Sequence, residues 1–286
     1  MIIVKIIGGL GNQMFQYAYA KALEKRGYEV KIDISSFDTY KLHGGYQLDK
    51  YNIDLSVSTR EENKEFYHDE LFFKILKKVG FYTPKIVKEK SLLFDDELLK
   101  VQDNSYVDGY FQSEKYFIDI RNILLKQFAI KQSLSAYTKK IKSIILDKEN
   151  SCSLHVRRGD FTNSTNIDIH GVCSLEYYQK AIEYLKRNCI DLNFFIFSDD
   201  MQWVRENLKL ENAIYVDSKE NRLPHEDMYL MSLCSHNIIA NSSFSWWGAW
   251  LNKNNDKIVV APKRWFADDK SYNQSSDIAP DNWEKI

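Results

Sequence analysis

Apolar residues follow two different periods along the first part of the chain, and the two periods alternate. Residues 2–7 are a nearly continuous apolar run that only Lys5 interrupts, which is typical of a buried strand. Apolar residues then recur three and four positions apart, as on one face of a helix, at Phe15, Ala18, Tyr19, Ala22 and Leu23. After Gly27 the strand pattern returns and ends at Asp33. The pattern predicts a β-α-β unit with a glycine-rich turn between its first strand and its helix.

The second half of the chain alternates between the same two patterns more regularly. Four apolar runs indicate strands, at residues 151–156, 193–197, 237–240 and 257–261, with a shorter one at 214–216. Helical patterns separate them, and one of these begins at Ser174. Strands that alternate with helices form parallel sheets with right-handed crossovers. The expected fold class is therefore α/β.

The middle of the chain is less regular. Helical stretches are expected at residues 62–79, 113–128 and 133–147, with a short strand at 106–111. A polar cluster at residues 147–150 precedes the strand at 151–156 and indicates a domain joint. We therefore expect an N-terminal α/β domain over residues 1–147 and a C-terminal α/β domain over residues 148–286, facing each other across a cleft.

The strand at 151–156 runs directly into two arginines and a glycine. His155 and Arg157 have the same parity and leave the strand on one face, and Arg158 lies beside them on the turn. In an open α/β sheet, ligands bind at the carboxyl ends of the strands. Two guanidiniums at such an edge form a set of donors suited to carboxylate or phosphate oxygens. The alternative is a pair of solvated arginines on a loop.

Two other strands of this half end in polar residues that would meet the arginines at one edge of the sheet. Residues 198–200, Ser-Asp-Asp, follow the strand at 193–197, and residues 241–245, Asn-Ser-Ser-Phe-Ser, follow the strand at 237–240. A carboxylate suits the paired N–H donors of guanine, and a helix N-terminus offers amides and hydroxyls to an anion. Taken alone, each of these two groups is more simply a helix cap. Together with the arginines they make three polar groups at the ends of parallel strands, and this combination predicts a nucleotide-diphosphate site.

Composition limits the ligands and the setting of such a site. The chain has 39 basic and 40 acidic residues, so its net charge of −1 gives no general attraction to nucleic acid. Its four cysteines lack disulfide or zinc spacing, and reduced thiols fit a cytoplasmic protein. No apolar run approaches the roughly 20 residues of a membrane span. No Asp-x-Asp pair is present to hold a divalent ion, so we expect no metal, and the arginines would balance the diphosphate charge.

The first glycine turn points to a different class of protein. Gly9-x-Gly11, with Asp33 about 20 residues further on, is close to the dinucleotide-binding fingerprint. Met14, however, occupies the position of the third small residue, and its bulk would hold the helix away from the strand where a pyrophosphate needs them close. An NAD-dependent oxidoreductase is therefore a weak alternative.

Three long motifs and two short ones carry a family resemblance. They are Gly8-Gly9-Leu10-Gly11-Asn12-Gln13, His155-Val156-Arg157-Arg158-Gly159-Asp160, Asn241-Ser242-Ser243-Phe244-Ser245-Trp246-Trp247-Gly248, Gly109-Tyr110-Phe111-Gln112 and Phe197-Ser198-Asp199-Asp200. Together they resemble the α-1,2-fucosyltransferases of bacteria and animals, glycosyltransferase family 11. The resemblance implies a GT-B fold of two Rossmann-like domains, GDP-β-L-fucose as donor, inversion at the anomeric carbon, and no metal or other cofactor. It also implies a galactose-terminated glycan as acceptor, used at its 2-hydroxyl.

The resemblance assigns roles to residues of the C-terminal domain. Arg157 would hold the β-phosphate of the donor, with Arg158 supporting the phosphate or the strand end. His155 and Asp200 would contact guanine or ribose. The diphosphate would be contacted through amides and hydroxyls by Ser243, Phe244 and Ser245.

In the N-terminal domain, Gly9, Asn12 and Gln13 resemble the loop that approaches the fucose and the acceptor. From the residues alone, Asn12 and Gln13 either bind a polar ligand or cap the helix. An inverting attack calls for a base near the acceptor hydroxyl. Asp160 is the first candidate, although it equally suits a structural ion pair with Arg158. Further candidates are Asp168, His170 and Glu226.

Two alternatives stay open beside this reading. One is a related transferase that uses another GDP-sugar, such as GDP-mannose. The other is a non-catalytic carbohydrate-binding protein, because aromatic residues make up 14% of the chain and aromatic surfaces stack on sugars. By resemblance, the product is a bacterial surface glycan such as an O-antigen repeat, made in the cytoplasm, with peripheral contact to the inner membrane left open.

Overall fold

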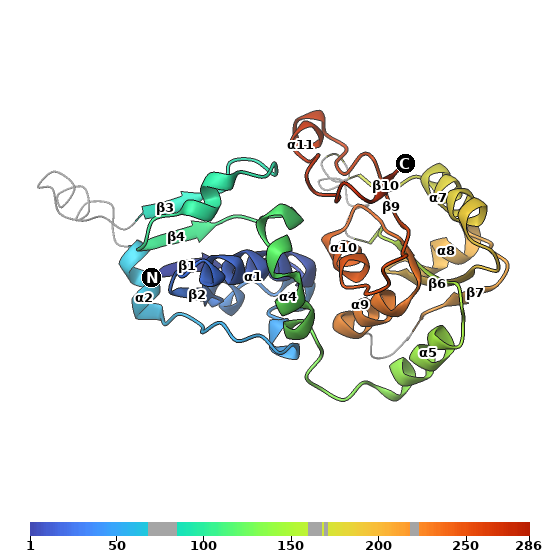
Figure 1. The fold of residues 1–286 in the computed structure, drawn as a ribbon, viewed down its shortest axis with the longest axis horizontal. Coiled ribbons are helices and arrows are strands. Elements are labelled where there is room, and N and C mark those ends of the chain that lie inside the picture. The colour runs from blue at the N-terminus through green and yellow to red at the C-terminus, as the bar shows by residue number, and fades with distance from the viewer. Residues whose placement is uncertain (68–84, 160–167, 169–170, 218–222) are drawn as a thin grey trace, which may run out of the picture. The chain divides into compact units, whose positions relative to one another are not determined.

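The computed structural model describes residues 1–67, 85–159, 168, 171–217 and 223–286. The chain divides into two compact units, Met1–Lys131 and Gln132–Ile286. Each unit is an α/β layer structure built on its own parallel sheet (Figure 1). The expected α/β fold class is therefore confirmed.

Unit 1 is built on a four-stranded sheet with the strand order β2-β1-β4-β3. Its strands are β1 (Ile2–Lys5), β2 (Val30–Asp33), β3 (Lys85–Lys88) and β4 (Ser105–Asp108). All three pairings are parallel, and Ile2 lies opposite both Val30 and Ser105. The carboxyl ends of the strands therefore meet at one edge of the sheet.

Helices cover both faces of this sheet. They are α1 (Leu10–Lys25), α2 (Arg60–Tyr67) and α4 (Arg121–Gln127). On the face of α1, Tyr19 stacks on Phe111 with ring centroids 3.8 Å apart. On the other face, Phe66 of α2 packs with Ile3 and Tyr106. Apolar residues thus pack on both faces of this sheet.

Unit 2 is built on a six-stranded parallel sheet with the strand order β10-β9-β8-β5-β6-β7. Its strands are β5 (Ser151–Val156), β6 (Asn193–Ser198), β7 (Ala213–Tyr215), β8 (His236–Ile238), β9 (Val259–Ala261) and β10 (Glu284–Lys285). Every residue of β5 is buried, which fits its place in the middle of the sheet. Its neighbours β6 and β8 both run parallel to it, so the three carboxyl ends lie at one edge.

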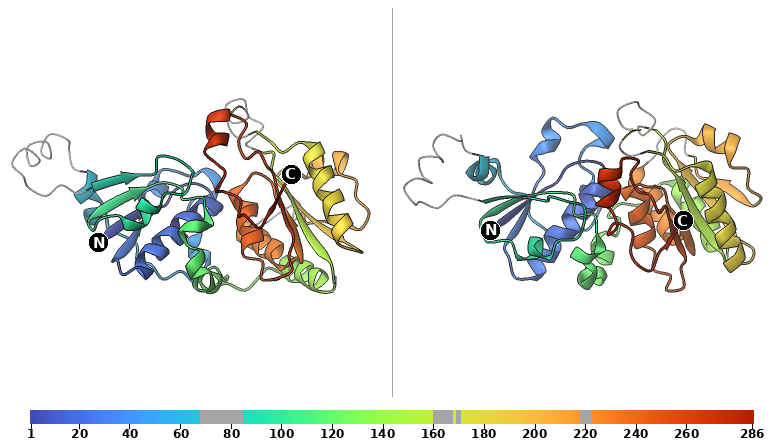
Figure 2. Two further views of the ribbon diagram at one scale, coloured as in Figure 1. Left: turned by 45° about the horizontal axis from the view of Figure 1, so that its top comes forward. Right: turned by 90° about the horizontal axis from the view of Figure 1, so that it is seen from above.

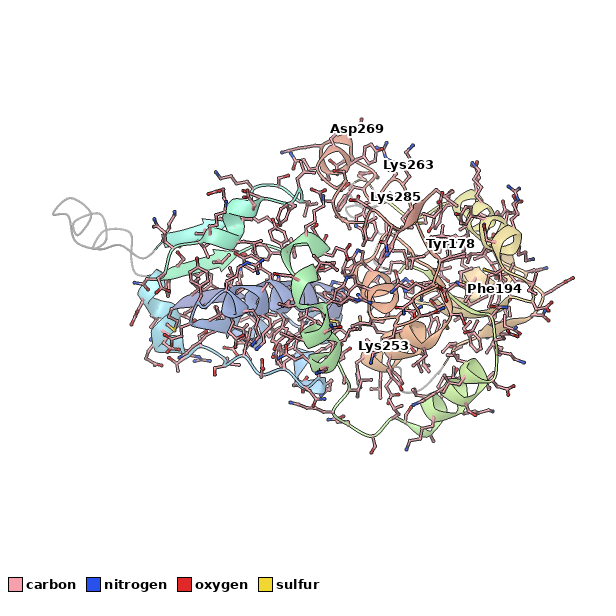
Figure 3. All side chains as sticks on the ribbon, in the orientation of Figure 1. Tyr178, Phe194, Lys253, Lys263, Asp269 and Lys285 are labelled. Carbon is pink, nitrogen blue, oxygen red and sulfur yellow. The ribbon has the colours of Figure 1, made fainter. Side chains whose placement is uncertain are left out.

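Five helices of unit 2 lie in two layers, one on each face of the sheet (Figure 2). They are α5 (Ala136–Leu146), α7 (Leu175–Asn188), α8 (Met201–Asn207), α9 (Pro224–Leu233) and α10 (Ser243–Trp250), and the short helix α11 (Asp269–Asn273) lies off the sheet. Apolar residues of α7 and α8 pack on one face, and those of α5 and α9 pack on the other. Tyr178 and Phe194 belong to the first of these cores, whereas the lysines 253, 263 and 285 are exposed (Figure 3).

Two predicted elements of unit 1 end or break earlier than expected. The strand expected at 106–111 ends at Asp108, because Glu89 accepts hydrogen bonds from the amides of Tyr110 and Phe111 and turns the chain out of the sheet. The helix expected at 113–128 is instead two 3₁₀ turns followed by α4. Phe117 interrupts it with φ −145°, since its buried ring packs against Phe15.

The division after Lys131 differs from the boundary at 147/148 expected from sequence. Helix α5 belongs to unit 2 because its first turn is bonded to Glu226 of α9. Of the helix expected at 62–79, the described part is covered by α2. Among the described residues, no helix is both long and apolar enough to span a membrane.

Candidate functional site

Arg157 follows the last residue of β5 and is paired with a carboxylate from the neighbouring strand. Its Nη1 lies 2.9 Å from Oδ2 of Asp199, and both side chains are mostly buried. Asp199 comes directly after β6, which pairs in register with β5 along its whole length. The parallel sheet therefore holds this guanidinium at its carboxyl edge, which argues against a freely solvated arginine.

Arg158 is held from two directions. Its backbone N–H donates to Oδ1 of Asp199 at 2.9 Å, and its Nε donates to Oδ2 of Asp200 at 3.3 Å. Its guanidinium also lies 4.2 Å from the ring centroid of Trp203 on α8, a distance at which cation and ring attract each other. Both predicted arginines are thus anchored by the loop between β6 and α8. Sequence reasoning did not foresee the contributions of Asp199 and Trp203.

Gly159 leaves room for this carboxylate. A Cβ at position 159 would lie 2.6 Å from Oδ2 of Asp199. The backbone here is not left-handed, so the need is for space and not for an unusual φ. The close approach of the Asp199 carboxylate therefore leaves no space for a side chain at position 159.

His155 and Asp200 were both predicted to contact guanine or ribose, and their surroundings differ. His155 is only 3% exposed, and its ring centroid lies 5.6 Å from that of Phe244. Asp200 is part of the edge itself: it caps α8 through the N–H of Trp203 and also accepts from Arg158. Asp200 therefore caps α8, a role that the sequence had suggested for its neighbours Ser198 and Asp199.

Two of the three serines at the start of α10 form side-chain hydrogen bonds near the first turn of the helix. Ser242, not Ser243, is the N-cap, and its Oγ accepts from the N–H of Phe244 at 3.3 Å. Ser245 is buried and its hydroxyl donates to the carbonyl of Ser242, within its own helix. Ser243 is only half-buried, in the first position of the helix. The hydroxyl of Ser245 is thus committed to the protein, whereas Ser243 lies at the surface of the edge.

The predicted edge of unit 2 is therefore assembled from three strand ends. The Arg157–Asp199 pair joins the end of β5 to that of β6, and the contact between His155 and Phe244 joins β5 to α10. Asn241 ties further loops to it, because its Nδ2 donates to the carbonyls of Gly171 and Trp265. These contacts give the edge a fixed shape with two oriented cations.

In unit 1, Gln13 is a structural clamp. It is fully buried, its Nε2 donates to the carbonyls of Gly8 and Gly45, and its Oε1 accepts from the N–H of Gln47. It therefore does not cap α1, whose N-cap is Gly9, a residue without a side chain. These bonds use both donors of its amide, so the contribution to ligand binding predicted for it would be indirect.

Asn12 is half-buried, and a hydrogen bond from the side chain of Gln112 holds its amide. Its Oδ1 accepts from Nε2 of Gln112 at 2.8 Å, which connects the turn after β1 with the motif after β4. Gly8 makes the turn with φ +90°, a conformation that L side chains rarely adopt. The predicted Gly9 and Asn12 thus lie at the carboxyl edge of the unit 1 sheet.

The candidates for a general base differ in where they lie in the structure. Asp160 and His170 lie outside the described residues. Asp168 is exposed. Glu226 is 5% exposed and accepts hydrogen bonds from the Ser135 amide and hydroxyl and from the Thr138 hydroxyl. These hydrogen bonds make Glu226 a residue that joins two helices. Within the described part of the chain no three His, Cys, Asp or Glu residues cluster as a metal site would require.

Two α/β units, each built on its own parallel sheet, are the architecture of the GT-B fold. The crystal structure of fucosyltransferase NodZ from Bradyrhizobium matches with a TM-score of 0.52 at 12% identity, over 86% of this chain and 91% of that one. The chain belongs to glycosyl transferase family 11, whose family model matches residues 1–286. The α-1,2-colitosyltransferase of Escherichia coli is 36% identical over 100% of this chain and 99% of its own length. The O-antigen biosynthesis glycosyltransferase WbnK of Escherichia coli is 34% identical over 96% and 97%.

Proposed function

We propose that this family 11 glycosyltransferase moves L-fucose from GDP-β-L-fucose to the 2-hydroxyl of a terminal galactose, with inversion and without a metal. The observation that carries the proposal is the pair of guanidiniums at the end of β5, each anchored by a carboxylate of the next loop. Arginine presents a rigid set of donors that suits a diphosphate. The 1,2 linkage in the name of the colitosyltransferase supports attack by a 2-hydroxyl.

The transfer reaction requires positive charge beside the β-phosphate, where the GDP leaving group forms. The bond between the anomeric carbon and the β-phosphate oxygen breaks through an oxocarbenium-like transition state, and its electron pair passes to the phosphate. Arg157 would neutralise the charge that grows on that oxygen, and Asp199 would hold Arg157 in place. Ser243 and the amides at the start of α10 would contact the remaining oxygens.

Colitosyl transfer is the second candidate. It is favoured by the identity of 36% over the whole chain to a relative named for that sugar. Colitose is L-fucose without its 3-hydroxyl, so both donors would present the same diphosphate to Arg157 and Arg158. Discrimination between them would depend on whether a buried polar group is left unpaired by the missing hydroxyl.

The name of the second relative supports a role in O-antigen assembly. The acceptor would then be a galactose-terminated repeat at the cytoplasmic side of the inner membrane.

A transfer assay tests the proposal directly. The purified chain is incubated with GDP-fucose, GDP-colitose or GDP-mannose and a panel of galactose-terminated disaccharides, and the linkage of the product is determined. We expect an α-1,2-linked fucoside, in the presence of EDTA as well as in its absence. Product from GDP-colitose alone would establish the second candidate, and transfer that EDTA abolishes would contradict the metal-free mechanism.

A further inference from the structure

Trp203, in the first turn of α8, contacts one of the two arginines through its ring. Asp200 caps this helix, because its Oδ1 accepts from the N–H of Trp203 at 3.1 Å. Side chains of a helix lean toward its N-terminus, so an indole at this position reaches back toward the loop that precedes the helix. There it meets Arg158, whose guanidinium carbon lies 4.2 Å from the centroid of the ring.

The ring of Trp203 has a fixed place in unit 2. It packs against the apolar core on the face of the sheet that α7 and α8 cover, together with Met201 of the same helix. The cap from Asp200 holds the backbone of this turn, and the carbonyl of Trp203 accepts from Nδ2 of Asn207 at 2.8 Å. Because the core and the cap hold the ring, it is a platform for the arginine that lies on it.

The contacts that hold Arg158 leave its terminal nitrogens available. Its backbone N–H donates to Asp199, its Nε donates to Asp200, and its guanidinium lies on the indole of Trp203. Within the described part of the chain, neither Nη1 nor Nη2 of Arg158 forms a hydrogen bond, and the side chain is 22% exposed. A guanidinium has five N–H donors, so most of them remain for a ligand.

An aromatic ring orients a guanidinium in a different way from a carboxylate. A carboxylate takes up N–H donors, whereas a ring attracts the cation through its face, and the attraction is strongest for tryptophan. A long side chain that is already ordered also loses less conformational freedom when a ligand binds. Trp203 therefore fixes Arg158 without occupying the donors that a phosphate needs.

We infer that Trp203 is a positioning residue of the donor site, which holds Arg158 in the orientation that binds the diphosphate of the nucleotide. The inference rests on the proposed function, because it takes GDP as that nucleotide. Trp203, Arg158 and the residues that hold them all belong to unit 2. Trp203 does not itself contact the nucleotide, and its whole effect passes through Arg158.

The test compares Trp203→Leu with Trp203→Phe in calorimetric titrations with GDP. Leucine fills part of the volume of the indole but has no aromatic face, whereas phenylalanine keeps a smaller one. We expect GDP to bind about three- to tenfold more weakly to Trp203→Leu, the size of effect that a partly exposed contact between cation and ring has on an equilibrium. Trp203→Phe should recover most of the wild-type affinity.

A double-mutant cycle separates this role from a purely structural one. In a chain that already carries Arg158→Ala, Trp203→Leu should cost no further affinity for GDP, because the group on which the ring acts is absent. Losses of affinity that add in the double variant would mean that Trp203 acts on the fold and not on Arg158, and they would overturn the inference.

A fluorinated tryptophan at position 203 tests the same contact with the shape of the ring kept. Fluorine withdraws electrons from the face of the ring and so weakens its attraction for a cation. We expect the affinity for GDP to fall as fluorine atoms are added, and this measurement serves even where Trp203→Leu does not fold. An affinity that is independent of fluorination would contradict the inference.

Tyr215→Leu is the matched control. The guanidinium of Arg205, also on α8, lies 4.4 Å from the ring centroid of Tyr215 on β7. Tyr215 is paired with Ile196, before the end of β6, so this second contact lies back from the carboxyl edge. Tyr215→Leu should bind GDP as tightly as the wild type does, and an equal loss in this variant would contradict a specific role of Trp203.

The outcomes separate the inference from the proposed function. A wild-type chain that binds no GDP would overturn the proposed function, and the inference with it. A wild-type chain that binds GDP, beside a Trp203→Leu variant that binds it equally tightly, would overturn the inference alone. Weaker binding by Trp203→Leu that disappears in the Arg158→Ala background supports it.

Discussion

At the scale of single residues, the proposed donor site depends on the pairing of arginine with aspartate. Arg157 is 2.9 Å from Asp199, and Arg158 binds Asp199 through its backbone and Asp200 through its side chain. A guanidinium has five N–H donors, so an ion pair through one nitrogen orients the group without exhausting it. The carboxylates therefore fix the direction in which the arginines would meet the diphosphate of the proposed donor.

Replacing Arg157 by lysine keeps the charge but removes the rigid set of donors. We expect Arg157→Lys to lower the rate of sugar transfer by ~10²–10³-fold, the usual effect of losing a group that stabilises a developing oxyanion. Arg187→Lys is the control, because Arg187 forms only an exposed pair with Glu183 on α7. Steady-state transfer assays on both variants decide the matter, and an active Arg157→Lys variant would remove the phosphate role.

Asp199→Asn tests whether the carboxylate positions Arg157. The substitution keeps the size of the side chain but weakens its bond to the guanidinium. We expect GDP to bind at least about tenfold more weakly, since a charge-assisted hydrogen bond contributes roughly 1.5–3 kcal/mol. Calorimetric titration gives the affinity. Tighter binding of GDP would mean that Asp199 competes with the phosphate instead of positioning the arginine.

Sequence patterns predict the arginines but not their partners. The alternation in residues 151–156 and the two arginines after it are local features, and they place the guanidiniums at a sheet edge. The bond to Asp199 arises only because β6 is the neighbour of β5, which is a matter of tertiary packing. The clamp formed by Gln13 depends in the same way on a loop over thirty residues further along.

At the scale of elements, the contact between α5 and α9 determines how unit 2 begins. Ser135 caps α5 through the N–H of Thr138, and both residues donate to the carboxylate of Glu226 on α9. Burial by itself would raise the pKa of Glu226, but the hydrogen bonds from Ser135 and Thr138 outweigh it, and the pKa is lowered overall. The ionised carboxylate is thus the form that joins the helices.

A lowered pKa makes this contact sensitive to acid. The stabilisation from Glu226 is complete above the ordinary carboxyl pKa of about 4.3 and is lost as the pH falls through the lower folded value. Glu226→Gln should therefore lower the free energy of unfolding by about 1–3 kcal/mol at pH 7 and by less at pH 3. Thermal melts across this range measure it. An equal loss at both pH values would contradict the ionised joint, and lost turnover in a folded variant would favour Glu226 as the base.

The helices and strands are predictable where the hydrophobic periodicity is strong. The prediction fails where tertiary contacts outweigh the local pattern. The strands β5 and β6 lie where the apolar runs predict them. The helix expected at 113–128 breaks at Phe117, because burial of that ring against Phe15 outweighs the local helical pattern. The loop that follows β2 has no hydrophobic periodicity, so the left-handed backbone of His43 could not be predicted from the sequence.

At the scale of the whole molecule, the alternation of strands and helices predicts two α/β units, and the structure contains two. The division lies before α5, because the bonds of that helix are to α9 of unit 2. The motifs that resemble family 11 follow β1 and β4 of unit 1 and β5, β6 and β8 of unit 2. All of them lie at the carboxyl edge of their sheet, which is where parallel α/β sheets bind ligands.

The binding of GDP to metal-free protein measures most directly whether two anchored guanidiniums bind a nucleotide diphosphate. GDP is titrated calorimetrically into EDTA-treated wild-type protein and into the Arg157→Lys variant. We predict binding to the wild type that is indifferent to EDTA and to added magnesium, and a loss of at least tenfold in affinity for the variant. Binding that requires the metal, or that is equally tight in both proteins, would contradict the assignment of the diphosphate to this edge.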